Sequence, residues 1–200
     1  MNLKLAKIFG VPIVKVENVY NLSENEINYI DNIKTFKRDD STRISKQKNI
    51  LNSLQLKKLK NKINECASFF IDNIICVDNK FEIVSSWIAK SINKHEKHNH
   101  KNAIFSVIYY AKANQSTLKI IKERNFITEG FNFDLNYKKL NDFNSTTMSY
   151  NVKTGDLIIF PGHLLHEGIN HSNKEKIVVG ANYFIRGEVG IKGNITTLRI

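Results

Sequence analysis

The sequence predicts an α+β domain in which helices come first and a mainly β core follows. Two segments between Ser23 and about residue 80 have apolar residues at helical spacing, and from Phe81 onward the apolar residues alternate with a period of two. Helices followed by six or more strands favour a sandwich or a barrel over alternating βαβ units. We therefore expect one domain over residues 1–200, with 1–80 as support and 81–200 as the β core.

The first segments are read from their caps and composition. Residues 3–16 are expected to form an edge strand or an extended arm, where Pro12 is tolerated. Ser23 and Glu26 have the spacing of a capping box, which predicts a short helix after them. Residues 35–50 are polar and charged, and they are read as a surface loop. A solvated connection is favoured there over a lid that covers a site.

A second helix is expected over residues 54–76. Its apolar residues recur at steps of three and four, which gives one stripe that should pack on the outside of a sheet. The stripe consists of Leu56, Leu59, Ile63, Cys66, Phe70 and Ile74.

The β core is expected to contain at least six strands. They are predicted at 81–92, 104–112, 116–121, 147–152, 156–160 and 177–184, with a last run near 191–200. Residues 123–146 form a polar, Asn-rich insertion. The segment between the strands at 156–160 and 177–184, which holds His163 and His166, is read as a loop.

Composition limits the classes of partner. The net charge of +11 comes from scattered lysines, so a solvated basic surface is favoured over nucleic-acid binding, for which the Lys-rich segment 35–62 is the candidate. No apolar run is long enough to span a bilayer, so no membrane partner is expected. Cys66 and Cys76 lie too far apart on one helix for a disulfide, which fits a reducing cytoplasm. The oligomeric state is open.

The six histidines fall in two groups, at 95–100 and 163–171. On an extended backbone His98 and His100 point the same way, and the same parity continues to Ser106 and Tyr110. Two ligands from one strand edge and a third, His166, from a distant strand could hold one face of a metal ion, as in the non-haem iron facial triad. The alternative is that the first group is an exposed polar loop.

The strand that begins at Lys176 indicates what could lie beside the metal. Lys176, Gly180 and Asn182 share one face of this strand, which suggests a roomy and polar inner face. A metal on one strand and a cation on the next could hold an anionic molecule between them.

Four segments resemble the Fe(II)- and 2-oxoglutarate-dependent oxygenases, in particular a group of bacterial and phage proteins related to prolyl hydroxylases. These segments are IFGVPI, SSWIAKSINKHEKHNH, IFSVIYY and GDLIIFPGHLLHEGINHSNKEKIVVGANYF. The order and the spacing of the four segments together match those of this group. The resemblance implies a double-stranded β-helix, a jelly-roll of the cupin type, with the N-terminal helices packed on one sheet. It also implies a cytoplasmic enzyme of a bacterium or of a phage-infected cell.

The resemblance also implies roles for individual residues. His98 and His166 would bind Fe(II). His100 stands where the superfamily has an acidic ligand. Two possibilities are therefore open: His100 is a third histidine ligand, or the protein supplies only two ligands. Lys176, in place of the usual arginine, and Tyr110 would hold the far carboxylate of 2-oxoglutarate. Ser106 and Asn182 would line its pocket. His163 and His95 are the substitute ligands.

The implied reaction uses O2 and 2-oxoglutarate to hydroxylate a primary substrate, which could be prolyl or otherwise peptidyl but cannot be identified from the sequence. Three alternatives stay open. One is a non-catalytic metal-binding protein on the same fold, and another is a nucleic-acid-binding protein. The third is a zinc hydrolase of the cupin type, for which only Glu96 and Glu167 could serve as the general base.

Overall fold

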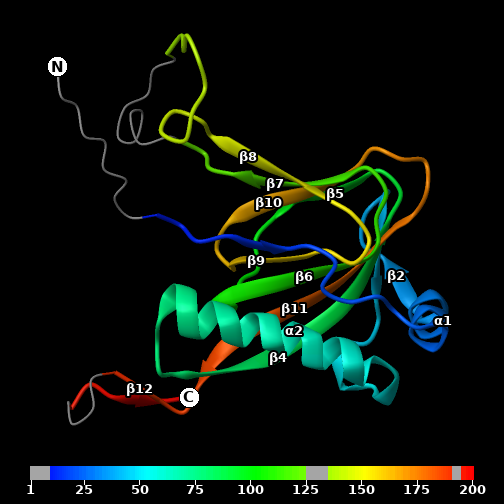
Figure 1. The fold of residues 1–200 in the computed structure, drawn as a ribbon, viewed down its shortest axis with the longest axis horizontal. Coiled ribbons are helices and arrows are strands. Elements are labelled where there is room, and N and C mark those ends of the chain that lie inside the picture. Colours follow the sequence, from blue (N-terminus) through cyan, green and yellow to red (C-terminus); the bar gives the residue numbers. More distant parts are fainter. Residues whose placement is uncertain (1–9, 125–134, 191–194) are drawn as a thin grey trace.

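Two antiparallel sheets face each other and form most of the molecule (Figure 1). The computed structural model describes residues 10–124, 135–190 and 195–200. The larger sheet has the strand order β1 (Val14–Val16), β9 (Leu157–Pro161), β6 (Phe105–Lys112), β11 (Lys176–Arg186), β4 (Lys80–Ser91), β3 (Thr42–Ser45) and β2 (Thr35–Lys37). The smaller sheet has the order β5 (Lys94–His98), β10 (Leu165–Asn170), β7 (Ser116–Ile121) and β8 (Thr147–Val152). Strands β12 (Glu188–Val189) and β13 (Leu198–Arg199) form a separate ribbon.

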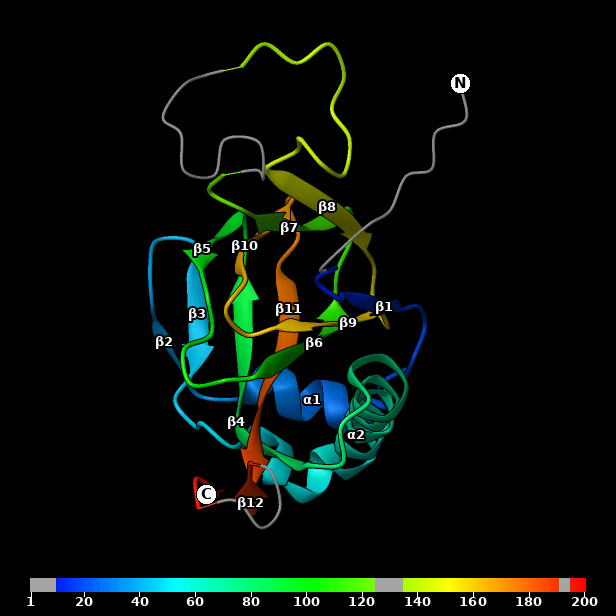
Figure 2. The ribbon, with the colours of Figure 1, turned by 90° about the vertical axis from the view of Figure 1, so that its left-hand side faces the viewer.

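The helices cover the outer face of the larger sheet, as Figure 2 shows for α1 (Glu24–Asn32) and α2 (Lys57–Phe70). Two 3-10 helices, Ile50–Asn52 and Leu54–Leu56, precede α2, and a π-helical segment, Ile71–Ile75, follows it. Leu56, Leu59, Ile63 and Phe70 of the predicted stripe pack with the outward side chains of β6, β9 and β11 in one buried cluster, whereas Ile74 is 42 % exposed. The predicted fold, a double-stranded β-helix with helices packed on one sheet, is therefore confirmed.

Strand periodicity separates two cores. In β6, Phe105, Val107 and Tyr109 face the helices, whereas Ile108 and Tyr110 face the smaller sheet. The space between the sheets is thus lined by side chains such as those of Ile108 and Tyr110. Functional side chains can be placed in this space without disturbing the packing of the larger sheet against the helices.

The capping box at the start of α1 is confirmed. The Ser23 hydroxyl accepts a hydrogen bond from the Glu26 amide, and the Glu26 carboxylate accepts one from the Ser23 amide. The edge strand expected in residues 3–16 is β1, which pairs with β9 alone; residues 1–9 lie outside the described part. Among the described residues, no helix is long and apolar enough to span a membrane.

Two sequence expectations are wrong. Residues 35–50 are not a loop, because β2 and β3 form a hairpin that extends the larger sheet beside β4. The segment after Pro161 is not all loop either, because β10 occupies Leu165–Asn170. Strands β3 and β10 escape a search for apolar alternation because their buried positions include polar side chains. These are Thr42 and Ser45 in β3, and His166 and Asn170 in β10. The insertion at 123–146 and the run at 191–200 lie partly outside the described residues.

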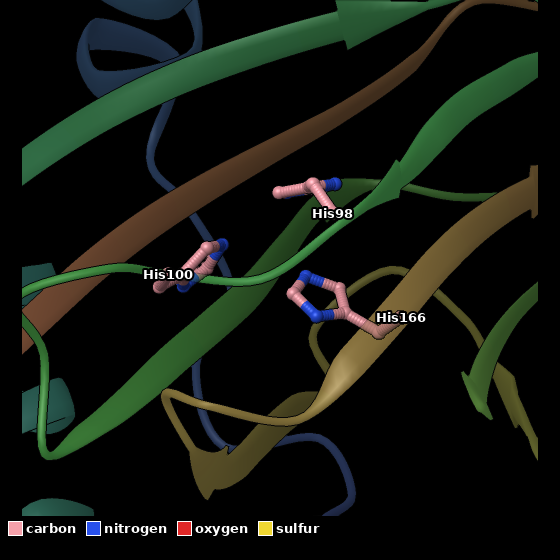
Figure 3. Close-up of side chains that lie close together, drawn as sticks. All are labelled: His98, His100 and His166. Carbon is pink, nitrogen blue, oxygen red and sulfur yellow. The ribbon is translucent and has the colours of Figure 1, made fainter. Parts of the chain in front are cut away.

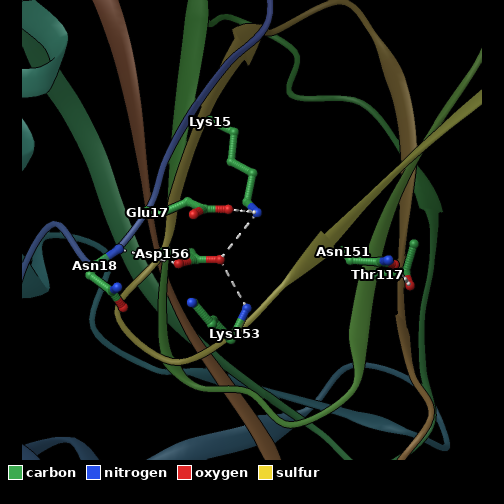
Figure 4. Close-up of polar contacts among 7 residues, drawn as sticks. All are labelled: Lys15, Glu17, Asn18, Thr117, Asn151, Lys153 and Asp156. Atoms are coloured by element: carbon green, nitrogen blue, oxygen red, sulfur yellow. Dashed lines mark hydrogen bonds and ion pairs between the residues drawn. The ribbon is translucent and has the colours of Figure 1, made fainter.

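A buried carboxylate joins the N-terminal arm to the β8–β9 turn (Figure 4). Asp156 is fully buried and accepts hydrogen bonds from the backbone amides of Asn18, at 3.3 Å, and Lys153, at 3.1 Å. The Lys15 ammonium lies 3.6 Å from the same carboxylate and 2.7 Å from the exposed Glu17. Asp156 therefore fixes β1 and the segment that follows it against the turn that leads into β9.

Replacing Asp156 by alanine should lower the free energy of unfolding by about 2 to 4 kcal/mol, because two buried amides lose a charged acceptor. Urea denaturation measures this loss. The matched control is Glu17→Gln, which removes the exposed partner of the same lysine and should leave the unfolding midpoint nearly unchanged. Equal midpoints for the two variants would show that Asp156 is not the anchor.

Candidate metal centre

Three histidines meet between the two sheets (Figure 3). His98 ends β5 and lies directly opposite His166 of β10 in the antiparallel pairing, and His100 follows two residues after β5. One ring nitrogen from each of these three residues lies within 4.8 Å of those of the other two. Small side-chain rotations would bring the nitrogens to the spacing of about 3 Å that neighbouring ligands on one ion require.

A β-bulge orients the first group of histidines. His166 pairs with His98 and Gly168 pairs with His95, so two residues of β5 stand opposite one residue of β10. The extra residue resets the parity of β5. Consequently His95 and His98, three positions apart, both face the interior, and their rings stack with a centroid separation of 4.6 Å.

Each of the three histidines has its Nδ1 engaged. Nδ1 of His98 donates to the Glu96 carbonyl at 2.6 Å, and Nδ1 of His166 donates to the Leu164 carbonyl at 2.9 Å. A carbonyl can only accept, so both Nδ1 atoms carry the proton and both Nε2 atoms have a free lone pair. Such oxygen partners are the usual means of fixing the tautomer and orientation of a metal-binding imidazole.

The third histidine is held by a side-chain relay. The Ser106 hydroxyl donates to Asn182 Oδ1 at 2.8 Å and lies 2.6 Å from Nδ1 of His100. Because the hydroxyl proton points at Asn182, the serine oxygen accepts from His100, whose Nε2 is left free as well. Ser106 and Asn182 thus lie behind His100, and their predicted contact with a cosubstrate stays a prediction.

Burial keeps these imidazoles neutral. It lowers the pKa of His166 to about 4, with a further contribution from His98, and the pKa of His100 to about 2, with a further contribution from His166. Burial also lowers the pKa of His98. A neutral imidazole is the form that binds a metal, so the three ligand candidates are ready for an ion at neutral pH.

Aromatic side chains enclose the cluster. Trp87 packs edge-on against His100 with a centroid separation of 5.1 Å, and Phe160 packs against His166 at 4.7 Å. The Trp87 indole occupies the space above Gly180, where a Cβ atom would lie only 2.4 Å from the indole ring. The face of β11 that appeared roomy in the sequence is therefore filled at Gly180.

Lys176 extends into the interior beside the cluster. It is 4 % exposed, and its Nζ lies 2.9 Å from the position that a Cβ atom on Gly168 would take. Gly168 shares the inner face of β10 with His166, two residues away. The structure shows no anionic partner for the Lys176 ammonium among the described residues. Burial lowers the pKa of Lys176 to about 8, so the group is still mainly a cation at pH 7.

Tyr110 lies on the same inner surface. It pairs with Val178, which follows Lys176 on the inner face of β11. The side chain is buried in the cluster between the sheets, and this burial raises the pKa of its hydroxyl above the usual range. Tyr110 is therefore a neutral hydroxyl on the inner face of the larger sheet.

The substitute ligands are placed differently. His163 is exposed and does not belong to the cluster. His95 is buried, but its Nε2 accepts a hydrogen bond of 2.7 Å from Arg38 in the β2–β3 turn. Neither histidine offers a free Nε2 to the ion that the other three would hold.

The general bases considered for a zinc hydrolase are also misplaced: Glu167 forms ion pairs with Lys94 and Lys119, and Glu96 is exposed.

Sequence reasoning missed Arg38 and Gly168. Arg38 could not be found because its segment was read as a loop. Gly168 could have been found, since it shares a strand parity with His166 and removes the side chain that would otherwise meet Lys176.

A groove of about 960 Å³ opens next to the histidines. Asn99, between His98 and His100, and Leu165, before His166, belong to its lining. Its remaining lining includes the ends of β7 and β8 and the arm before β1. The groove therefore lies beside the cluster, although the histidine that lines it is His163 and not one of the three.

Comparison with known proteins agrees with this geometry. Residues 85–182, which include all three histidines, match the model of a family described as "Putative 2OG-Fe(II) oxygenase". No curated protein matches the sequence.

Solved structures share the fold at low identity. An oxidoreductase of the 2OG-Fe(II) oxygenase family from Burkholderia pseudomallei has a TM-score of 0.59 at 9% identity, covering 86% of this chain and 83% of its own. A prolyl-4-hydroxylase from Pseudomonas putida has a TM-score of 0.58 at 11% identity, covering 88% and 94%. HygX from Streptomyces hygroscopicus, solved with nickel and 2-oxoglutarate, has a TM-score of 0.56 at 10% identity, covering 86% and 82%.

Replacing His166 by alanine should abolish stoichiometric binding of Co(II), a spectroscopic substitute for Fe(II), because it removes one of three converging nitrogens. The matched control is His163→Ala, which removes a nearby exposed imidazole and should leave the Co(II) affinity unchanged. Ser106→Ala should weaken binding by about ten- to a hundredfold, since the orientation of His100 is then no longer fixed. Titration followed by visible absorption measures all three, and an equal loss in the His163 variant would contradict this assignment.

The metal-free protein should lose stability as the pH falls from about 6.5 to about 4. In the unfolded chain a histidine takes up its proton near pH 6.5, whereas folded His166 stays neutral down to about pH 4. Unfolding is then coupled to proton uptake, which lowers the free energy of unfolding by up to about 1.4 kcal/mol per pH unit for each such histidine. Urea midpoints across this range measure the slope, and a flat profile would contradict the neutral cluster.

Proposed function

We propose that the chain is a 2-oxoglutarate-dependent dioxygenase of the 2OG-Fe(II) oxygenase family, whose model matches residues 85–182, and that its iron is held by three histidines. The single observation that carries the proposal is the convergence of His98, His100 and His166 with every Nδ1 bonded to an oxygen. Imidazole suits iron, and three ligands on one side leave the other side open.

The donor set fits a metal but differs from the two-histidine, one-carboxylate pattern. Among the described residues, the group that could hold an ion consists of these three histidines and contains no carboxylate. Three neutral ligands leave the ion's charge uncompensated by the protein. An anionic cosubstrate would then supply the negative charge at the site.

The cation that would receive 2-oxoglutarate is Lys176. A buried ammonium without an anionic partner is costly, so a bound carboxylate explains why it is there. Gly168 leaves the space for its head group, and the Tyr110 hydroxyl could donate a second hydrogen bond to the same carboxylate. Lysine supplies a point charge instead of the bidentate fork of arginine, so Tyr110 should contribute more to orientation.

Iron with 2-oxoglutarate and O2 supplies the oxidising chemistry that hydroxylates a C–H bond. The part of this chain is to hold the metal with one side open, to orient the cosubstrate through Lys176, and to keep the cavity dry with Trp87 and Phe160. The primary substrate would enter through the groove beside Asn99 and Leu165. A prolyl or other peptidyl substrate is the class that we favour.

Conversion of 2-oxoglutarate to succinate by the iron-loaded protein tests the proposal. Turnover that requires both iron and His166 supports it.

One observation favours a second candidate, a non-catalytic metal-binding protein: His100 stands in place of an acidic ligand. Stoichiometric iron without succinate formation, with or without candidate peptides, would favour this second function.

Lys176→Met should weaken 2-oxoglutarate binding by about ten- to a hundredfold while metal affinity changes little. The substitution keeps the length of the side chain and removes one charge-assisted contact. Calorimetric titration of the Mn(II)-loaded protein measures both affinities. Lys174→Met, at an exposed lysine two residues away, is the control and should bind normally. Unaltered 2-oxoglutarate affinity in the Lys176 variant would remove this residue from the site.

A further inference from the structure

The outer edge of β8 differs from the other outer edges of the two sheets. The exposed backbone of an edge strand invites pairing with another chain, and proteins usually guard it with charged residues. The other three outer strands are guarded: β1 by Lys15, β2 by Lys37, and β5 by Lys94, Glu96 and Lys97. Strand β8, TMSYNV, has no charged residue and no proline.

The hydrogen-bond register identifies the open groups on this edge. The Lys122 amide donates to the Thr146 carbonyl, and bonded pairs alternate with non-bonded pairs along an antiparallel ladder. The even-numbered residues of β8 therefore bond to β7, whereas Thr147, Ser149 and Asn151 direct their N–H and C=O groups outward. The Ser145 hydroxyl bonds to both backbone groups of Thr147. For Ser149 and Asn151 the structure shows no backbone partner among the described residues.

The open edge borders the groove that lies beside the histidine cluster. Met148 and Tyr150, on the inner face of β8, line this groove together with Ile120 of β7, Leu165 and Asn99. Met148, Ile120 and His166 lie in one cross-strand row of the smaller sheet. A chain that pairs with β8 would thus run along the groove, and its alternate side chains would point to the same interior as His166.

We propose that an extended polypeptide substrate docks by adding a strand to the outer edge of β8 and continues along the groove to the histidine cluster. The inference deepens the proposed function, on which it rests. The groove, at about 960 Å³, is at the upper end of the range of about 300–1,000 Å³ for pockets that hold a drug-sized ligand, a size comparable with a short peptide. The backbone supplies affinity through Ser149 and Asn151, and the apolar inner face selects the side chains next to Met148 and Tyr150.

Ser149→Pro is the discriminating variant. It removes the amide that points outward and leaves the bonds between β7 and β8 intact, because proline is tolerated where an edge N–H faces solvent. Ser149→Ala is the matched control, since it changes the same exposed side chain and keeps the amide. Neither variant alters a residue of the candidate metal centre.

The probe is a display library of random peptides of about ten residues, long enough to cover a strand of about five or six residues and the groove. Selection uses the Mn(II)- and 2-oxoglutarate-loaded wild-type protein. Selected peptides, synthesised and measured by fluorescence anisotropy, should bind the Ser149→Ala variant as they bind wild type. They should bind the Ser149→Pro variant at least about fivefold more weakly. Amide exchange at Ser149 and Asn151 should also slow on binding.

Three results would overturn the docking mode. The first is equal peptide affinity for the proline and alanine variants, and the second is a library that yields no binding peptide. The third is a wild-type dimer that Ser149→Pro converts to a monomer, because the edge of β8 would then pair with a second copy of this chain. Metal and 2-oxoglutarate titrations of the same samples keep the two proposals distinguishable. Peptide binding by a protein that takes up no 2-oxoglutarate would retain the docking site and remove the oxygenase function.

Discussion

The antiparallel pairing of β5 with β10 is the contact on which the candidate site depends. It sets His98 opposite His166, although β6, β7, β8 and β9 lie between these strands in the sequence. The bulge in β5 adds one residue, and this residue turns both His95 and His98 inward. A pairing shifted by one residue would turn His166 outward and leave no cluster.

Backbone and side-chain oxygens then give the cluster its chemistry. Carbonyls and the Ser106 hydroxyl fix the three Nδ1 protons, and burial keeps the rings neutral. Beside them, the absence of a side chain at Gly168 admits the Lys176 ammonium. Neutral nitrogens and a buried cation therefore face one interior, which is the arrangement that the proposed iron and 2-oxoglutarate would require.

Much of this arrangement follows from the sequence, and the exceptions have a common cause. Runs of apolar and β-branched residues predict β6 and β7, and the apolar stripe predicts α2, because these elements bury hydrophobic side chains. The β2–β3 hairpin and β10 were read as loops, because their buried positions carry polar residues that bond to other strands. Arg38 was missed for this reason. The grouping of His98, His100 and His166 was predicted from parity and resemblance, whereas the bulge and the hydroxyl relay depend on three-dimensional pairing.

The most direct measurement is the anomalous scattering of crystals grown with Mn(II) and 2-oxoglutarate. The account predicts one strong peak within about 2.0–2.3 Å of Nε2 of His98, His100 and His166, with the far carboxylate of the cosubstrate at the Lys176 ammonium. A peak coordinated by His163 or His95, or an ion bound by only two of the three histidines, would contradict the three-histidine centre.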